Sequence, residues 1–437
     1  MSALKKIKRP SSEKVWFKLD NAGKIFPGQS TSKWSNIFRM SVILKEKIDP
    51  ELLARAVEMT MPRFPCFDVR LRKGLFWYYF EKNDNLPPVL PDIKNPCQRV
   101  KRKENNGFLF RVYYYEKRIS VEFFHALTDA YGTVRFLNTL TAQYLRLQGH
   151  EIPPGESVLD LNEPATEDEL NDPFPRFASS KAKLKKGNKF VYHVRGTKLP
   201  AHMCTIVTGT MPLDQVKAKA KSYGVTITEL ISAELLYVHY QMQQRDLSRA
   251  NRKKDISVQI PVNLRNFFPT KTLRNFSLTY IDRINPNMGE YTFEEMLKQV
   301  ALYLRYVNNE KMLNAMITGN LKLETNPIMR ILPLVIKDAA IGLSFRITGE
   351  KSTTVMFSNI GIVKIPEAMQ QYVDRYVIMS GPGKLNGARC AGITYGNSFE
   401  VTIVSLYKEM DIQREFFRRM VKLGIPVKIE SNILFDE

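Results

Sequence analysis

The sequence predicts an α/β fold with mixed sheets, arranged in two halves. Within residues 107–149, two segments rich in Val, Ile, Phe and Tyr precede a segment whose apolar residues recur every three or four positions, which indicates a β-hairpin followed by a helix. A strand, a helix and another hairpin are expected within residues 34–80. Residues 151–172 contain eight acidic residues and no Lys or Arg, whereas residues 175–199 contain eight Lys or Arg and no acidic residue. This change predicts a linker or crossover between two halves.

The first half opens with a strand, a helix and a hairpin. The segment WSNIFRMSVIL suits a strand, and Asp49-Pro50 then begins a helix, because Pro is favoured in the first helical turn. The segments FDVRLRKG and LFWYYFEK predict a hairpin around Lys73 and Gly74.

One histidine stands at the junction of a strand and a helix. Strands are predicted for residues 108–115 and 118–124, and His125 follows where the second strand ends. A helix is expected from Tyr131 to Gly149, and Asp129 lies in the connecting loop. A neutral imidazole is the commonest general base near pH 7 and acts only when its ring is held, so this loop suits a catalytic histidine. The same two residues also fit an ordinary polar pair.

The second half continues the alternation of strands and helices. A strand near Cys204 precedes a helix from Leu213 to Tyr223, and Thr226 or Thr228 then caps a long amphipathic helix. His239 in that helix is expected to be a packed histidine, not a catalytic one. The other predicted elements are a strand at 256–265, helices near 293–318 and 327–340, a strand at 355–361, a strand ending near Ser405 and a helix at 414–423.

Length and composition fit a globular protein. The 437 residues, of which 44% are hydrophobic, suffice for two or three domains with large cores. No apolar run approaches the roughly 20 residues that span a bilayer, and no secretory signal is evident, so a cytoplasmic protein is expected. The four cysteines are widely separated, which predicts reduced, buried thiols and neither a zinc site nor disulfides.

The formal net charge of +21 is the largest anomaly of the composition. Such a charge attracts polyanions, including nucleic acid, anionic membranes, the phosphates of coenzyme A and acidic carrier proteins. The chain has no arginine-rich recognition helix, zinc finger or RNP-like strand, so nucleic acid is not expected as a partner.

The string HALTDAYG, from His125 to Gly132, resembles the HxxxDG signature of the acyltransferases related to chloramphenicol acetyltransferase. That superfamily includes condensation domains of peptide synthetases, plant acyltransferases, wax ester synthases and alcohol acetyltransferases, and this chain resembles the last two groups most. Two positions depart from the fuller HHxxxDG form. Phe124 replaces the first histidine, and Ala130 replaces the glycine after the aspartate, with Gly132 two places later.

The resemblance implies two chloramphenicol acetyltransferase-like domains of similar topology, with an active-site tunnel at their interface. An N-terminal acyltransferase subdomain would cover residues 1–175 and carry the motif. A basic linker would follow at 176–205, and a C-terminal subdomain would cover residues 206–437.

The same resemblance implies roles for the motif residues. His125 would be the general base, while Asp129 and Gly132 would hold the loop. In the family an arginine from the other half holds the motif aspartate, so Asp129 is expected to pair with Arg265, with Arg274 as the second choice. Which arginine pairs cannot be read from spacing.

A second segment resembles the part of the family that lies across the acyl channel. Ser358, Asn359 and Gly361 could offer a hydroxyl, an amide and a close backbone approach to an oxyanion or a substrate. The same residues also suit the end of a strand followed by a turn.

The resemblance finally implies an acyltransferase that moves an acyl group from a thioester donor, acyl-CoA, to a hydroxyl acceptor. No metal and no permanently bound cofactor are expected. The expected partner is a small-molecule alcohol or amine. An acidic acyl carrier protein and a peripheral membrane contact are further possible partners. The chain is expected to be a monomer. Two alternatives remain, a condensation-type synthase that uses carrier-bound donors and a catalytically inactive binding protein of the same fold.

Overall fold

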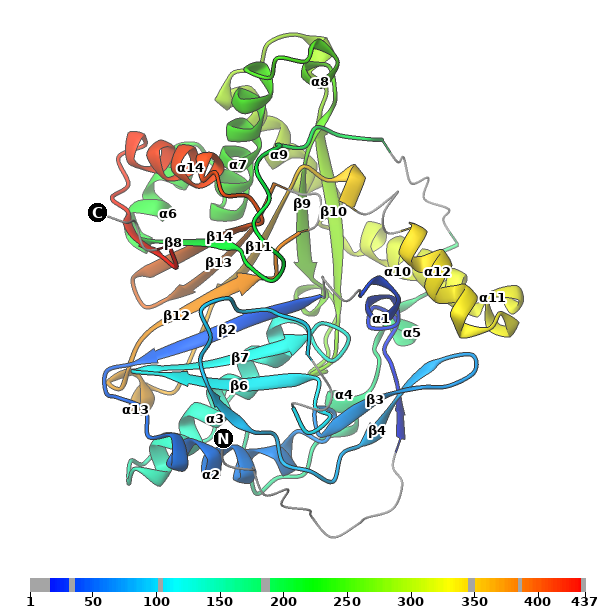
Figure 1. The fold of residues 1–437 in the computed structure, drawn as a ribbon, viewed down its shortest axis with the longest axis vertical. Helices are drawn as coiled ribbons and strands as arrows, with labels where there is room; N and C mark the ends of the chain where they lie inside the picture. The colour runs from blue at the N-terminus through cyan, green and yellow to red at the C-terminus, as the bar shows by residue number, and fades with distance from the viewer. Residues whose placement is uncertain are drawn as a thin grey trace.

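The computed structural model describes residues 16–30, 36–100, 105–181, 189–344, 350–383 and 387–433. The described chain forms two lobes, each built on a mixed sheet (Figure 1). Part of the predicted linker at 176–205, residues 182–188, lies outside the described residues.

A five-stranded mixed sheet forms the first lobe. Its strands, in spatial order, are β12 (Val373–Ser380), β2 (Ile37–Leu44), β7 (Arg118–Phe124), β6 (Phe110–Tyr115) and β5 (Val89–Pro91). The predicted hairpin is β6 and β7, which pair antiparallel with Phe110 opposite Phe123. The predicted helices are α2 (Pro50–Thr60) and α3 (Ala130–Leu147), and α3 packs on β2 and β7. The ring of Phe136 on α3 meets those of Phe110 and Phe123 edge to face, so the hairpin and the following helix share one aromatic core.

A seven-stranded mixed sheet forms the second lobe. In spatial order it contains β10 (Ser277–Ile284), β9 (Ile256–Asn263), β11 (Val355–Ile362), β13 (Ala388–Tyr395), β14 (Ser398–Ser405), β8 (Thr205–Pro212) and β15 (Lys428–Ser431). Its helices are α6 (Leu213–Ser222), α7 (Ile227–Gln244), α9 (Phe293–Val307) and α14 (Asp411–Lys422). The central helix α7 contacts the other three and lies on β9 and β11.

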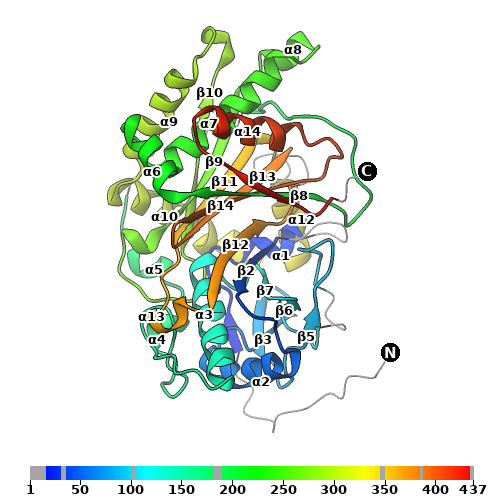
Figure 2. The same cartoon turned by 90° about the vertical axis from the view of Figure 1, so that its left-hand side faces the viewer.

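One strand of the predicted 206–437 half joins the sheet of the first lobe. Strand β12 pairs antiparallel with β2 and also packs against β13 and β14. It is therefore the edge strand of the first sheet that meets the second sheet (Figure 2). Its buried Tyr376 donates a hydrogen bond of 2.7 Å to Asn138 Oδ1 on α3. The two lobes therefore share a strand as well as a linker.

Smaller elements lie beside the two main sheets. A three-stranded sheet has the order β1 (Trp16–Lys18), β4 (Tyr78–Lys82) and β3 (Val69–Lys73). Four further helices lie on the right of Figure 1, namely α1 (Ile25–Gln29), α10 (Glu310–Thr325), α11 (Pro327–Ile331) and α12 (Leu334–Ser344). The remaining short helices are α4 (Glu167–Leu170), α5 (Phe174–Phe177), α8 (Arg249–Arg252) and α13 (Glu367–Gln370).

Two predicted helices are each divided in the structure. The helix expected near 293–318 ends at Val307, because Asn309 caps a new helix by accepting from the Met312 amide at 3.0 Å. The helix expected near 327–340 is interrupted before Leu334, since Pro333 has no amide hydrogen to continue the ladder. Of the two candidate caps of α7, Thr226 is the one used.

All four cysteines are free and buried, and their burial agrees with the prediction. Within the described ranges, no helix combines the length and the apolar character that crossing a bilayer requires.

Candidate active site

His125 lies in the turn that follows β7, half-buried at the junction of the two lobes. Its amide donates to the Asn36 carbonyl at 2.8 Å, which continues the pairing of β7 with β2 by one residue. The imidazole stacks on Phe26 of α1, with centroids 4.7 Å apart, and tilts against Phe38 of β2 at 4.9 Å. Backbone and ring are therefore both held.

The Nδ1 atom of His125 lies 3.0 Å from Oδ1 of Asn275, a residue of the second half. The amide group of Asn275 donates from Nδ2 to Asp20 Oδ2 at 3.2 Å. Because a carboxylate only accepts, this contact turns the Asn275 oxygen toward the histidine. An amide oxygen also only accepts, so His125 carries its proton on Nδ1 and keeps a lone pair on Nε2.

Asp20 is fully buried and anchors this arrangement. It accepts from the Gly23 amide at 2.5 Å and from the Asn275 amide at 3.4 Å, and its Oδ2 lies 3.5 Å from Nε of Arg274. Burial raises the pKa of Asp20, while Arg274 and the amide donors oppose that rise. The chain of contacts therefore runs from His125 through Asn275 and Asp20 to Arg274.

Burial lowers the pKa of His125 below its ordinary value of 6.5. Asp129 is the largest opposing influence, followed by hydrogen bonds that include the one to Asn275, and Arg389 adds to the lowering. The ring is therefore neutral at pH 7, which is the state that a general base requires.

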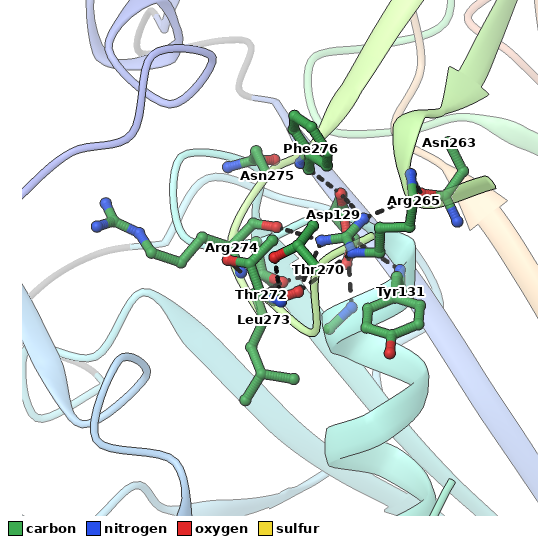
Figure 3. A network of polar contacts seen from close by, with 12 residues as sticks. Asp129, Tyr131, Asn263, Arg265, Thr270, Thr272, Leu273, Arg274, Asn275 and Phe276 are labelled. Atoms are coloured by element: carbon green, nitrogen blue, oxygen red, sulfur yellow. Dashed lines mark hydrogen bonds and ion pairs between the residues drawn. The ribbon is translucent and has the colours of Figure 1, made fainter. Parts of the chain in front are cut away.

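Asp129 ties the two halves together, because its carboxylate contacts Arg265 and the backbone of the second half (Figure 3). Its Oδ1 caps α3 by accepting from the amides of Tyr131 and Gly132 at 3.1 and 3.4 Å. Its Oδ2 accepts from Arg265 Nη1 and from the Phe276 amide, both at 2.8 Å. Both carboxylate oxygens thus accept hydrogen bonds from the protein itself.

Arg265 is the arginine that contacts Asp129, and Arg274 is bound to Asp20 instead. Arg265 also donates to the carbonyls of Thr272 and Arg274 at 2.9 and 2.6 Å, and its guanidinium lies 4.3 Å from the centre of the Tyr131 ring. Figure 3 shows these contacts gathered around one guanidinium.

Gly132 lies where the backbone of the second half approaches α3. A Cβ added there would lie 2.2 Å from Thr128 Oγ1 and 2.3 Å from the Leu273 carbonyl oxygen. Thr128 Oγ1 itself donates to that oxygen at 2.6 Å. The missing side chain therefore allows the two halves to meet beside the motif.

The second group of predicted residues lies on β11 and has other contacts. Asn359 donates from Nδ2 to Thr228 Oγ1 on α7 at 2.9 Å, and its Oδ1 accepts from the Gly361 amide at 3.1 Å. Gly361 has φ +81°, in the left-handed region, beside an irregularity in the pairing of β11 with β13. No hydrogen bond recorded among the described residues joins Ser358, Asn359 or Gly361 to His125.

Three residues that hold the imidazole had no role predicted from the sequence. They are Asn275, Asp20 and Phe26, and none of them belongs to the HALTDAYG motif. Asp20 and Asn275 are 255 residues apart in sequence, so only the fold brings them together. His239 is a packed histidine, because it is fully buried and its Nδ1 lies 2.7 Å from the Leu235 carbonyl. The described residues contain no group of three or more His, Cys, Asp or Glu side chains that could hold a metal.

No family model and no curated protein matches the sequence. Solved structures, in contrast, match nearly the whole chain. TRI101 of F. sporotrichioides, complexed with coenzyme A and T-2, is 10% identical with a TM-score of 0.63, over 96% of this chain and 100% of that one. TRI3 trichothecene 15-O-acetyltransferase from Fusarium sporotrichioides is 11% identical with a TM-score of 0.58, over 96% of each chain. The first condensation domain of the CDA synthetase is 12% identical with a TM-score of 0.56, over 94% of this chain and 96% of that one.

This chain therefore has the two-lobe fold of chloramphenicol acetyltransferase-like acetyltransferases and condensation domains, which confirms the predicted fold. The tunnel between the lobes stays a prediction.

Proposed function

We propose that this chain is an acyltransferase that moves an acyl group from a thioester donor to a hydroxyl acceptor, with His125 as the general base. One observation carries the proposal. The contacts of Asn275 with His125 and Asp20 hold a neutral imidazole in the tautomer whose Nε2 can accept a proton.

The proposed reaction is direct transfer. Nε2 of His125 removes the proton from the acceptor hydroxyl while the acceptor oxygen attacks the thioester carbonyl carbon. The tetrahedral intermediate then collapses, the carbon–sulfur bond breaks, and the leaving thiolate takes the proton back from the imidazolium. Asp129 is not an acid or base in this scheme, since Arg265 and three backbone amides occupy its oxygens.

Ser358 and Asn359 are proposed to face the oxyanion or the substrate, with Gly361 allowing close approach. Asn359 keeps one Nδ2 hydrogen beyond its bond to Thr228, and Ser358 offers a hydroxyl. Substitution of each by Ala would test them, with a lower kcat expected and little change in stability.

Acyl-CoA is the proposed donor. The net charge of +21 favours both the coenzyme A phosphates and an acidic carrier protein, and the fold is shared with proteins of both kinds. A condensation-type synthase with carrier-bound donors is therefore the second candidate.

The test is thiol release from acetyl-CoA and longer acyl-CoA donors in the presence of a pool of alcohols and amines. The assay is repeated with the same acyl groups bound as thioesters to the phosphopantetheine of an acyl carrier protein. His125→Ala should lower the rate about a hundredfold or more. His202→Ala, at an exposed histidine, is the matched control and should leave it unchanged. Activity with the carrier alone would favour the condensation-type enzyme. Absence of release from every donor would favour an inactive binding protein.

A further inference from the structure

Helix α12 presents its apolar side to solvent. Val335, Ile336 and Leu343 are 67%, 52% and 59% exposed, and Ala339 and Ala340 between them are exposed as well. These positions recur at helical spacing, so they form one face. A surface helix normally turns such a face toward the core, and α12 is reversed.

The two charged residues of α12 face the protein instead. Lys337 is buried, donates to the Phe76 carbonyl at 3.0 Å and lies 3.5 Å from the centre of the Trp77 ring. Asp338 accepts from the Tyr78 hydroxyl at 2.7 Å. Specific polar contacts with the β3–β4 hairpin therefore hold α12 with its apolar face outward.

Neighbouring elements extend this face into a patch. The tip of the β3–β4 hairpin lies against α12, where the Leu334 amide donates to the Leu75 carbonyl at 2.9 Å. Helix α1 also packs on α12, so closely that a Cβ on Gly28 would lie 3.1 Å from Asp338 Oδ1 and 3.3 Å from Ile341 Cγ2. What we call the apolar patch consists of the exposed side chains of Ile25, Leu75, Phe76, Trp77, Ile331, Val335, Ile336 and Leu343.

The charges around the apolar patch are mainly positive. Lys322 and Arg330 are exposed on α10 and α11, and Lys73, half-exposed beside the turn of the hairpin, lies 3.8 Å from Asp338 Oδ2. The nearby acids are engaged, since Glu324 binds Lys24 and Asn21 and Asp338 binds Tyr78. Aliphatic residues, a tryptophan at a hairpin tip and flanking cations are together the composition of surfaces that enter the interface of an anionic bilayer.

We propose that the apolar patch docks this protein onto anionic lipid bilayers. A bilayer is favoured over a second copy of the chain because the copy would bring another net charge of +21 against this one. Helix α1 also links α12, the centre of the patch, to the candidate active site. Phe26 of α1 stacks on His125 while the same helix packs on α12, so docking would bring His125 near the lipid surface.

Flotation of the full chain with vesicles tests the docking without requiring turnover. The wild type should float with phosphatidylcholine–phosphatidylserine vesicles, float less with phosphatidylcholine alone, and dissociate as salt is raised. The double variant V335E/I336E should bind at least about tenfold more weakly, because it puts charge into the docked face. Since both positions are exposed, this variant should keep the circular dichroism and melting temperature of the wild type.

The matched control is L302E/V421E, which places the same charges at exposed apolar positions on α9 and α14. It should bind vesicles like the wild type. Failure of the wild type to float with either vesicle would overturn the proposal. An equal loss of vesicle binding in both double variants would also overturn it. A wild-type dimer that V335E/I336E converts to a monomer would also overturn it, because the occupant would then be a second copy. Failure of the proposed acyl transfer would leave the docking result unaffected.

Discussion

His125 Nδ1 and Asn275 Oδ1 lie 3.0 Å apart, although 150 residues separate them in sequence. The contact joins the turn after β7 in the first lobe to the loop before β10 in the second. It sets both the tautomer and the orientation of the proposed base, so catalysis would depend on how the two lobes meet.

Asn275→Ala should therefore lower kcat of acyl transfer by roughly 10²–10⁴, because the imidazole loses its fixed tautomer while remaining in place between Phe26 and Phe38. The measurement is steady-state kinetics together with ¹⁵N NMR of the histidine nitrogens. The wild type should show one tautomer protonated on Nδ1, and the variant a mixture. Wild-type turnover in the variant would remove Asn275 from the proposed mechanism.

The part of the site that is local in sequence could be predicted. Strand, turn and helix periodicity placed His125 after a strand and Asp129 before a helix, and the structure has both there. The packing of α3 on the hairpin explains this success. The hairpin and the helix are neighbours in sequence and form one core, so the spacing of apolar residues within that one segment is enough to predict them.

The contacts between the halves could not be predicted in the same way. Spacing could not decide between Arg265, the preferred partner, and Arg274, and only the folded chain gives Arg265 to Asp129 and Arg274 to Asp20. Asp20 lies in an N-terminal segment with no recognisable motif. Strand β12 is not among the predicted strands, and its place in the first lobe's sheet depends on tertiary packing.

Removal of one partner from the Asp129–Arg265 pair should destabilise the protein strongly. Arg265→Met leaves a buried carboxylate without its cation, at a cost of about 3–5 kcal/mol in the free energy of unfolding. Arg418→Met is the matched control, since Arg418 lies 3.7 Å from Glu415 at the surface and its loss should change stability by less than about 0.5 kcal/mol. Urea unfolding of the three proteins measures both values, and equal midpoints would contradict a structural role for the pair.

Two glycine substitutions should have opposite effects on the free energy of unfolding. Gly132→Ala would force a methyl group to within 2.3 Å of the Leu273 carbonyl oxygen and should destabilise by about 1–3 kcal/mol. Gly319→Ala, inside α10 with no atom within 4 Å of the new methyl, should stabilise by about 0.4–1 kcal/mol. The melting temperatures of the two variants test both predictions. A fall of the same size in both would show that the close backbone approach at Gly132 does not determine the loss of stability.

The pH dependence of the reaction should report the buried environment of His125. Because burial lowers its pKa below 6.5, the neutral imidazole persists to lower pH than in a free histidine. The rate should therefore be constant above about pH 7 and fall on acidification with a midpoint below 6.5, since protonation removes the lone pair of Nε2. The measurement is kcat/KM between pH 5 and pH 8 beside an NMR titration of the His125 ring. A midpoint above 6.5 in the kcat/KM profile or in the NMR titration would contradict this prediction. It would mean that Asp129 raises the pKa of His125 by more than burial lowers it, and that the proposed base is charged near neutral pH.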